Sequence, residues 1–257
     1  MRWSLVAAVN NEHVLQTSLL SSPDVSSAAD RHLMRDYPSA GAAYNDAIPE
    51  CTGDVIIFAH QDVYLPPGWI EAVYREIEKV QGIDRNWGVL GVCGANTAGR
   101  LVGHLYSTGI RGVFGQALDR PVAAVSLDEM VIVLRRASGL RFDPALPGFH
   151  LYGADICLEA RRLGLSSFVI SAFCVHNSNG INRLPLSFWR AYWRLRTKWQ
   201  AELPVVTTCT SIYPDVARAG GEVLRGFAGG LFSRSTPGNR VEDPAALFRR
   251  LAIGDPS

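Results

Sequence analysis

The stretch VIIFAHQDVYLPPGWI, residues 55–70, joins a strongly apolar segment to a polar turn. The segment Val55–Ala59 is apolar throughout, which is the pattern of a strand buried on both faces of a parallel sheet. His60 and Asp62 follow directly, and a proline pair then stands where a helix can begin. Apolar residues continue at helical spacing at Trp69, Ile70, Val73, Ile77 and Val80. The stretch therefore predicts a buried strand, a polar turn and a helix in succession.

The same alternation of strand and helix extends along the chain. Further strands are predicted at Trp3–Val9, Gly88–Cys93, Met130–Leu134 and Ser167–Val175. Helices are predicted around Ala40–Ile48, Tyr152–Leu163 and Leu186–Trp199, and Gly164 is a C-terminal stop. We expect the glycine-rich residues 94–124 to form short strands and loops that cover a site. The alternation indicates an α/β fold, a Rossmann-like α/β/α sandwich with a mostly parallel central sheet, whose ligands bind outside the carboxyl ends of the strands.

The composition changes toward the end of the chain. Residues 1–200 are expected to form the α/β domain, and residues 201–257 a partly irregular C-terminal extension. From about Ala219 the extension is rich in Gly, Arg, Ser and Pro, which favours a loosely ordered tail or a short appendage.

The charge, hydropathy and cysteine spacing of the chain argue against several classes of protein. The net charge of +1 implies no strong attraction to nucleic acid. Apolar residues make up 47% of the 257 residues, but no apolar run reaches the roughly 18 needed to span a bilayer. The first apolar run stops at Asn10 without a small-residue cleavage site, so we interpret it as a strand and expect a cytoplasmic protein. The five cysteines are widely spaced without a CxxC pair, which argues against a finger-type zinc site and for reduced thiols.

Several polar residues stand where chemistry would be expected. His60 and Asp62 could together hold a divalent cation, or Asp62 could simply cap the turn. His176 also ends an apolar strand, and is either part of the same site or structural. Asp155 falls in the first turn of a helix, where it is either a capping carboxylate favoured by the helix dipole or a general base.

Two further pairs of residues have either a functional or a structural role. Asp128 and Glu129 precede a strand, and either face a substrate or cap that strand. His150 and Tyr152 either shape an acceptor pocket or pack locally. The basic, aromatic helix from Leu186 would more often present a docking face than a sugar platform.

Four segments occur in the order seen in family 2 glycosyltransferases of the GT-A fold. They are NNE (10–12), AAYNDAIPECTGDVIIFAHQDVYLPPGWI (42–70), RFDPALPGFHLYGADICLEARRLG (141–164) and FCVHNS (173–178). Over roughly residues 3–180 the chain most resembles the bacterial branch whose acidic motif reads F-x-H-x-D-V instead of D-x-D.

The resemblance implies a metal site and a catalytic base. Asp62 matches the second aspartate of D-x-D, which binds the metal that bridges the donor diphosphate. His60 replaces the first aspartate and would ligate the metal or contact the ribose, and His176 matches a late metal-binding histidine. The implied cofactor is Mn²⁺ or Mg²⁺; an imidazole suits Mn²⁺, because Mg²⁺ prefers oxygen. Asp155 matches the acidic residue that serves as base in inverting members.

The resemblance also implies binding residues. Nucleotide binding is expected at Val9, Asn11, Glu12, Asn45, His60 and Gln61. Tyr44 replaces the arginine usual in the family, which removes a cationic contact to the diphosphate. Contacts to the acceptor or the donor sugar are expected from Asp128, His150 and Tyr152.

The implied activity is metal-dependent transfer of a sugar from a nucleotide-sugar donor to a hydroxyl group, with inversion. UDP is the usual donor nucleotide in the family, and the acceptor is expected to be a glycan or a lipid-linked intermediate in polysaccharide biosynthesis. We expect the protein in the cytoplasm, with peripheral contact at the inner face of the membrane. Two alternatives are a nucleotide-sugar nucleotidyltransferase, which would usually carry a basic glycine-rich loop after the first strand, and a non-catalytic binding domain, favoured by the departures at His60 and Tyr44.

Overall fold

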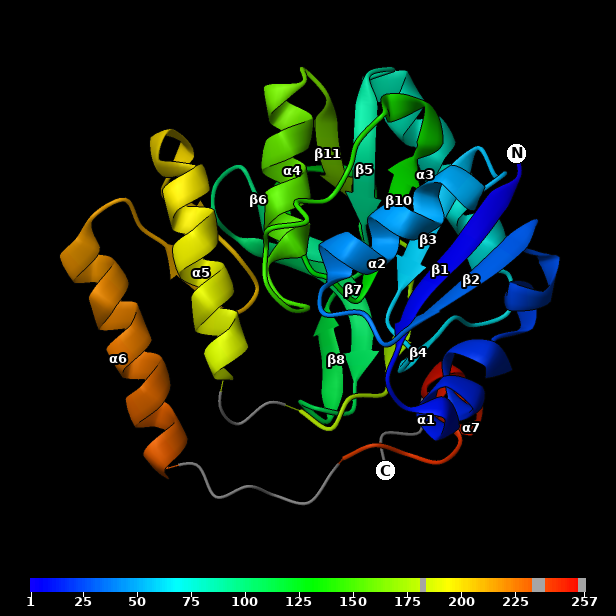
Figure 1. Cartoon of the computed structure of the whole chain (residues 1–257). Helices are drawn as coiled ribbons and strands as arrows, with labels where there is room; N and C mark the ends of the chain where they lie inside the picture. The colour runs from blue at the N-terminus through cyan, green and yellow to red at the C-terminus, as the bar shows by residue number, and fades with distance from the viewer. Residues whose placement is uncertain (181–183, 233–238, 254–257) are drawn as a thin grey trace.

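A large mixed sheet forms the centre of the protein (Figure 1). The computed structural model describes residues 1–180, 184–232 and 239–253. The first strands, in spatial order, are β2 (Asp30–Arg35), β1 (Trp3–Val9), β3 (Val55–Ala59), β10 (Val131–Arg135), β5 (Trp87–Gly91) and β11 (Ser166–Val169). The sheet continues through β9 (Val122–Leu127), β6 (Cys93–Asn96), β7 (Leu101–Ser107), β12 (Val175–His176) and β4 (Val63–Tyr64), and β8 (Gly112–Gly115) pairs with β7.

The predicted fold class is confirmed, and the sheet is mixed, with parallel pairs among the first strands and several antiparallel pairs beyond them. β1 runs parallel to both β2 and β3, and β11 runs parallel to β5. β10 lies between β3 and β5 and is antiparallel to both. The carboxyl ends of β1 and β3 therefore meet at one edge, where ligands bind in such sheets.

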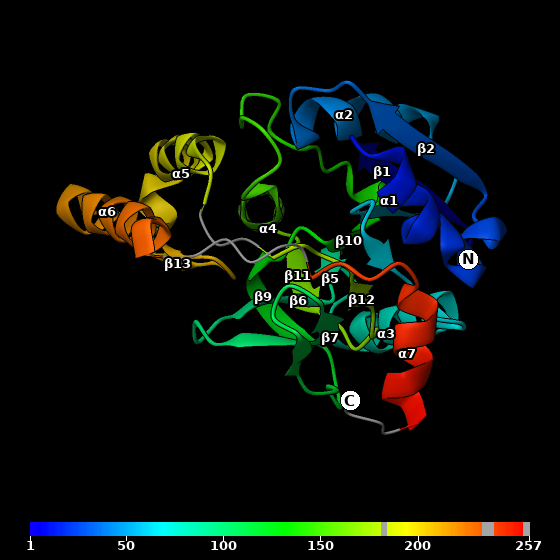
Figure 2. The same cartoon turned by 90° about the horizontal axis from the view of Figure 1, so that it is seen from below.

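Helices cover both faces of the sheet (Figure 2). α2 (Ala40–Ala47) and α4 (Tyr152–Arg162) lie on one face, and α3 (Trp69–Ile83) lies on the other. α3 buries the apolar residues that its spacing predicted: Trp69, Ile70, Val73, Ile77 and Val80. α4 ends before Gly164, whose φ of +72° is the left-handed conformation of a helix C-terminal stop.

The C-terminal half contains more regular structure than its composition indicated. α5 (Leu186–Lys198) lies outside α4, and α6 (Val216–Phe232) lies beside α5 (Figures 1 and 2). A short hairpin of β13 (Val205–Val206) and β14 (Ser211–Ile212) follows α5. α7 (Pro244–Ile253) buries Leu247 against Tyr64 and Val175 of the main sheet. The region expected to be loosely ordered thus includes two helices, and one of them joins the core.

Two segments differ from or refine the expectations. Residues 94–124 contribute β6, β7, β8 and β9 to the sheet itself, and not only a cover. The expected strand 167–175 is divided into β11 and β12. All five cysteines are free thiols, in line with the expected reduced state. Within the described ranges, no helix combines the length and the apolar character needed to cross a bilayer.

Candidate functional site

His60, Asp62 and His176 converge at the carboxyl ends of β3 and β12. Their ligand-type atoms all lie within 4.8 Å of one another. Asp62 Oδ1 is 3.5 Å from His176 Nε2, and the rings of His60 and His176 are 6.1 Å apart. A tight turn, in which the Val63 amide donates to the His60 carbonyl at 3.1 Å, places His60 and Asp62 together. The structure therefore brings together the three residues that the sequence predicted as a metal site.

His60, Asp62 and His176 influence one another's pKa values. Burial opposes ionisation of Asp62, but the nearby His176, His60 and Arg240 outweigh it and hold the pKa of Asp62 well below its usual range. Burial also disfavours a charged His176, yet the Asp62 carboxylate raises the pKa of His176 overall. Burial lowers the pKa of His60. The arrangement is a carboxylate between imidazoles, a ligand set suited to a divalent transition metal.

A residue from the C-terminal segment completes the surroundings of Asp62. Arg240 Nη2 donates to Asp62 Oδ2 at 3.0 Å, and Arg240 Nε donates to the Asn177 carbonyl at 2.8 Å. Asn177 is fully buried and exchanges two hydrogen bonds with Val241, each of 2.8 Å. Its side-chain amide also donates to Ser18 Oγ at 3.2 Å. These bonds fix the segment before α7 next to the predicted metal ligands.

A cavity of about 540 Å³ opens beside this group. Of the residues predicted to bind the nucleotide or the acceptor, four line it: Val9, His60, Gln61 and His150. Asp62 lines it as well, together with residues that the sequence did not suggest: Ala8, Asn10, Met34, Asp36, Tyr37, Phe149 and Ser187. Asn10, Asp36 and Tyr37 come from the turns that follow β1 and β2, where single residues give little indication of a binding role.

The turn after β1 is held by Gln61. Gln61 Oε1 accepts the amides of Asn10 and Asn11, both at 3.0 Å, and its side-chain amide donates to Asn10 Oδ1 at 2.5 Å. Asn11 caps α1 (Glu12–Thr17) by accepting the Val14 amide at 3.1 Å. Glu12 forms a bidentate pair with Arg35, at 2.6 and 3.2 Å. Asn11 and Glu12 are thus engaged locally and do not line the cavity.

Asn45 and Tyr44 occupy structural positions on α2. Asn45 exchanges hydrogen bonds of 2.8 and 3.0 Å with the backbone of Phe142. Tyr44 packs against Phe58 and Phe142 in the core, and burial raises its pKa to about 12. The Tyr44 hydroxyl lies 3.4 Å from that of Tyr152, so the edge of this aromatic cluster reaches the cavity.

Tyr152 connects the predicted metal site to the backbone of Glu129. Its hydroxyl lies 2.9 Å from His60 Nε2 and donates to the Glu129 carbonyl at 3.0 Å. Leu151, at φ +63°, turns the chain sharply just before α4 and brings Tyr152 to this place. A hydrogen bond of this kind orients an imidazole that binds a metal. Tyr152 therefore contacts the group of His60, Asp62 and His176 through His60.

Glu129 and Asp128 lie next to this connection. Burial and the neighbouring Asp128 raise the pKa of Glu129 to about 8, despite the backbone N–H groups of Leu151 and Gly153. Asp128 accepts hydrogen bonds from the Met130 amide at 3.1 Å and the Thr208 hydroxyl at 2.6 Å. Glu129 is thus a partly buried carboxyl whose pKa is raised toward neutral pH by burial and by Asp128.

Asp155 lies in a different environment from the one expected of a base. Its side chain is 1% exposed and accepts from Lys198 Nζ at 2.8 and 3.0 Å and from Trp199 Nε1 at 2.6 Å. Burial raises the pKa of Asp155, against the influence of Lys198 and Trp199. Asp155 does not line the cavity beside the histidines, and it joins α4 to the end of α5.

Comparisons with known proteins agree with this fold. The fold is that of the GT-A glycosyltransferases. The crystal structure of GalNAc-T7 with UDP, GalNAc and Mn²⁺ aligns with a TM-score of 0.51 and 12% identity, over 79% of this chain and 48% of that one. The structure of S. aureus TarS 1–349 in complex with UDP aligns with a TM-score of 0.50 and 13% identity, over 89% and 72% of the two chains.

Sequence comparisons cover smaller parts of the chain. Residues 32–90, which include β3 and the His60–Asp62 turn, match the model of the family named Glycosyl transferase family 2. A Fuscovulum blasticum protein named "ATP synthase subunits region ORF 6" is 32% identical over 144 residues, 54% of this chain. The match spans 57% of that relative, so little more than half of its length is compared.

Proposed function

We propose that the protein is a metal-dependent glycosyltransferase that transfers a sugar from a nucleotide-sugar donor to a hydroxyl group. The observation that carries this proposal is the group of His60, Asp62 and His176 beside a cavity in a GT-A fold. UDP is the proposed donor nucleotide, in line with the UDP bound to both structural relatives. A glycan or a lipid-linked intermediate is the proposed acceptor, and inversion the proposed outcome.

The side chains present fit a divalent cation. Two imidazoles and one carboxylate within 4.8 Å of one another suit Mn²⁺ better than Mg²⁺, which prefers oxygen ligands. A bound cation would supply the positive charge that stabilises the leaving diphosphate. Arg240 adds a fixed positive charge at the same carboxylate, 3.0 Å from Asp62 Oδ2. This guanidinium supports diphosphate binding at a site where Tyr44 replaces the usual arginine.

Glu129 is our candidate for the base that accepts the proton of the acceptor hydroxyl. Its main-chain carbonyl accepts from the Tyr152 hydroxyl beside His60, and its raised pKa leaves the carboxyl able to take and release a proton near neutral pH. Asp155, the base expected from the family resemblance, is the alternative. Its two oxygens already accept three hydrogen bonds, so we propose instead that it stabilises the packing of α5 on α4.

Other predicted residues receive roles by their position. Val9, Gln61 and His150 line the cavity and are proposed to contact the donor or acceptor directly. Asn11, Glu12 and Asn45 are proposed to act indirectly, by holding the turns that shape the nucleotide side. Asp128 is proposed to help set the charge of Glu129.

The first experiment is a calorimetric titration of UDP, GDP and CDP, with Mn²⁺ and with EDTA. We expect Mn²⁺-dependent binding of one nucleotide, lost in Asp62→Ala and retained in the control Asp119→Ala, which changes an exposed aspartate outside the cavity. Metal-independent binding that survives Asp62→Ala would refute the metal site. If no nucleotide binds, the non-catalytic alternative replaces this proposal.

We further propose that the reaction takes place in the cytoplasm at the inner face of the membrane. The exposed Arg190 and Trp193 of α5 are a basic and an aromatic residue on one helix, a combination suited to an anionic lipid surface. Sedimentation with anionic vesicles should capture the wild type more than Arg190→Glu. Equal capture of both would contradict this surface.

A further inference from the structure

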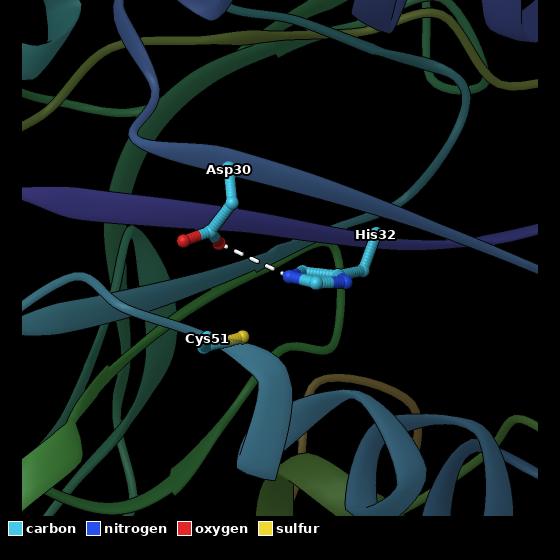
Figure 3. A group of neighbouring side chains, drawn as sticks. All are labelled: Asp30, His32 and Cys51. Atoms are coloured by element: carbon cyan, nitrogen blue, oxygen red, sulfur yellow. Dashed lines mark hydrogen bonds and ion pairs between the residues drawn. The ribbon is translucent and has the colours of Figure 1, made fainter.

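A second group of ligand-type side chains lies outside the candidate site. Asp30 and His32, on β2, and Cys51, just before β3, turn their side chains toward one space (Figure 3). A carboxylate oxygen, a ring nitrogen and the thiol sulfur all lie within 4.8 Å of one another. Asp30 Oδ1 is 3.1 Å from His32 Nε2.

This group is separate from the predicted glycosyltransferase site. Asp30 is paired with Ser4 near the start of β1, whereas Val9, which lines the donor cavity, is paired with Arg35. Since a strand rises about 3.3 Å per residue, the two ends of this pairing lie roughly 16 Å apart. The group thus lies near the amino-terminal end of the strands, opposite the edge where the nucleotide would bind.

The carboxylate is already oriented by neighbouring groups. Asp30 Oδ2 accepts the Thr52 amide at 2.9 Å and the Thr52 hydroxyl at 2.5 Å, while Oδ1 faces His32. Hydrogen bonds to one carboxylate oxygen are a usual way of positioning the other for a metal. The Asp30 and His32 side chains are 19% and 22% exposed, so solvent can reach the group.

The loop that carries Cys51 is held closely against β1. The Gly53 amide donates to Ser4 Oγ at 2.8 Å, and a Cβ on Gly53 would lie 2.6 Å from the Ser4 nitrogen. The loop therefore stays packed against β1, and Cys51 is buried beside Asp30. The Cys51 thiol now donates to the Ala47 carbonyl at 3.3 Å, a weak bond that a metal ligand would give up.

The chemistry of the three donors selects the metal. A thiolate disfavours Mg²⁺ and Ca²⁺, whereas sulfur, imidazole and carboxylate together suit Zn²⁺. Ligands at zinc bond lengths of about 2.0–2.3 Å and tetrahedral angles lie roughly 3.3–3.8 Å apart. The separations here approach that range, so small side-chain rotations would complete the geometry.

We propose that Asp30, His32 and Cys51 form a Zn²⁺ site that links strand β2 to the loop before β3. Cys51 binds as the thiolate after losing its proton to solvent, and a fourth position remains open to solvent. Because the site lies away from the donor cavity, its role is to stabilise the β2 side of the sheet. It is independent of the proposed transferase activity.

The test uses Co²⁺ as a spectroscopic substitute for Zn²⁺ on the whole, reduced protein after removal of metals. We expect added Co²⁺ to produce a thiolate-to-cobalt charge-transfer band. Cys51→Ser and His32→Gln should abolish the band, whereas Thr52→Val should weaken the affinity about 10-fold by removing one bond to Asp30. The controls Cys209→Ser and Asp62→Asn should keep it, because the group of His60, Asp62 and His176 contains no sulfur.

Thermal unfolding supplies a second measurement. In the Asp62→Asn background, which removes a ligand of the other candidate metal site, Zn²⁺ should raise the melting temperature. Adding His32→Gln, whose side chain is 22% exposed and can be replaced without opening the core, should abolish that rise. Absence of the charge-transfer band in the wild type, or its persistence in Cys51→Ser, would overturn the proposal. In that event Asp30 serves only to anchor Thr52.

Discussion

Arg240 Nη2 lies 3.0 Å from Asp62 Oδ2, although 178 positions separate the two residues. The other Asp62 oxygen lies 3.5 Å from His176 Nε2. One carboxylate is thus balanced by a guanidinium on one side and an imidazole on the other. A divalent cation held by Asp62 would have Arg240 as a close positive neighbour, and an anionic diphosphate would be attracted to both.

Replacing Arg240 should therefore separate metal binding from nucleotide binding. In Arg240→Gln we expect Mn²⁺ alone to bind about 3- to 10-fold more tightly, because a like charge next to the ligand is removed. Binding of UDP in the presence of Mn²⁺ should weaken by a similar factor. Calorimetric titration of Mn²⁺, with and without UDP, measures both effects. The matched control is Arg249→Gln on α7, whose arginine pairs with Asp243 at 3.7 Å; identical changes in both variants would contradict a specific role for Arg240.

Removing the Glu129 carboxylate should stop turnover and leave binding intact. We expect Glu129→Gln to lower kcat by about 10²–10⁴-fold, the usual contribution of a general base, with unchanged Mn²⁺-dependent binding of UDP. A transfer or donor-hydrolysis assay measures the rate. Glu159→Gln, which removes only a pair with Arg162 on the outside of α4, should keep full activity. Normal turnover in Glu129→Gln would exclude it as the base.

The raised pKa of Glu129 also predicts a pH-dependent stability. Its value of about 8 in the folded protein exceeds the ordinary value of 4.5, so the folded state binds more protons than the unfolded chain between these limits. The free energy of unfolding should fall as the pH rises through this window. Glutamine does not titrate, so the melting temperature of Glu129→Gln should exceed that of the wild type increasingly from pH 5 to pH 9. A constant difference would show that Glu129 ionises normally.

Replacing Asp155 should affect stability more than catalysis. Asp155→Ala leaves Lys198, which is 24% exposed, and the Trp199 indole without their buried partner. We expect a loss of about 3 kcal/mol in the free energy of unfolding, measured in urea. The milder Asp155→Asn should keep both folding and turnover. Loss of turnover in Asp155→Asn with unchanged stability would instead make Asp155 the base.

Sequence patterns were sufficient to predict elements and neighbouring residues where the residues that carry the pattern are close together in the chain. A continuous apolar run marked β3, and polar residues at the ends of two such runs marked His60, Asp62 and His176 as neighbours. The helical spacing of α3 likewise agreed with its buried face. In each case a few adjacent residues carry the information.

Contacts between segments far apart in the chain could not be predicted, because no sequence pattern marks them. Arg240 reaches Asp62 because α7 packs Leu247 on Tyr64 and Val175, a contact that depends on side chains far apart in the chain. Lys198 belongs to a run of basic residues typical of a solvated face, yet the packing of α5 turns it to Asp155. The acidic residue in the first turn of α4 could therefore not be assigned from its position alone.

The buried side chain of Asn177 has a consequence for local unfolding of the protein. Its side-chain amide forms hydrogen bonds with Ser18, at the end of α1, and with both backbone groups of Val241, just before α7. The segments around Ser18 and Val241 are therefore both held by Asn177. Local unfolding of either segment removes hydrogen-bond partners from the same buried amide. Hydrogen exchange at the two places should be correlated, so that they behave as one cooperative unit despite their distance along the chain.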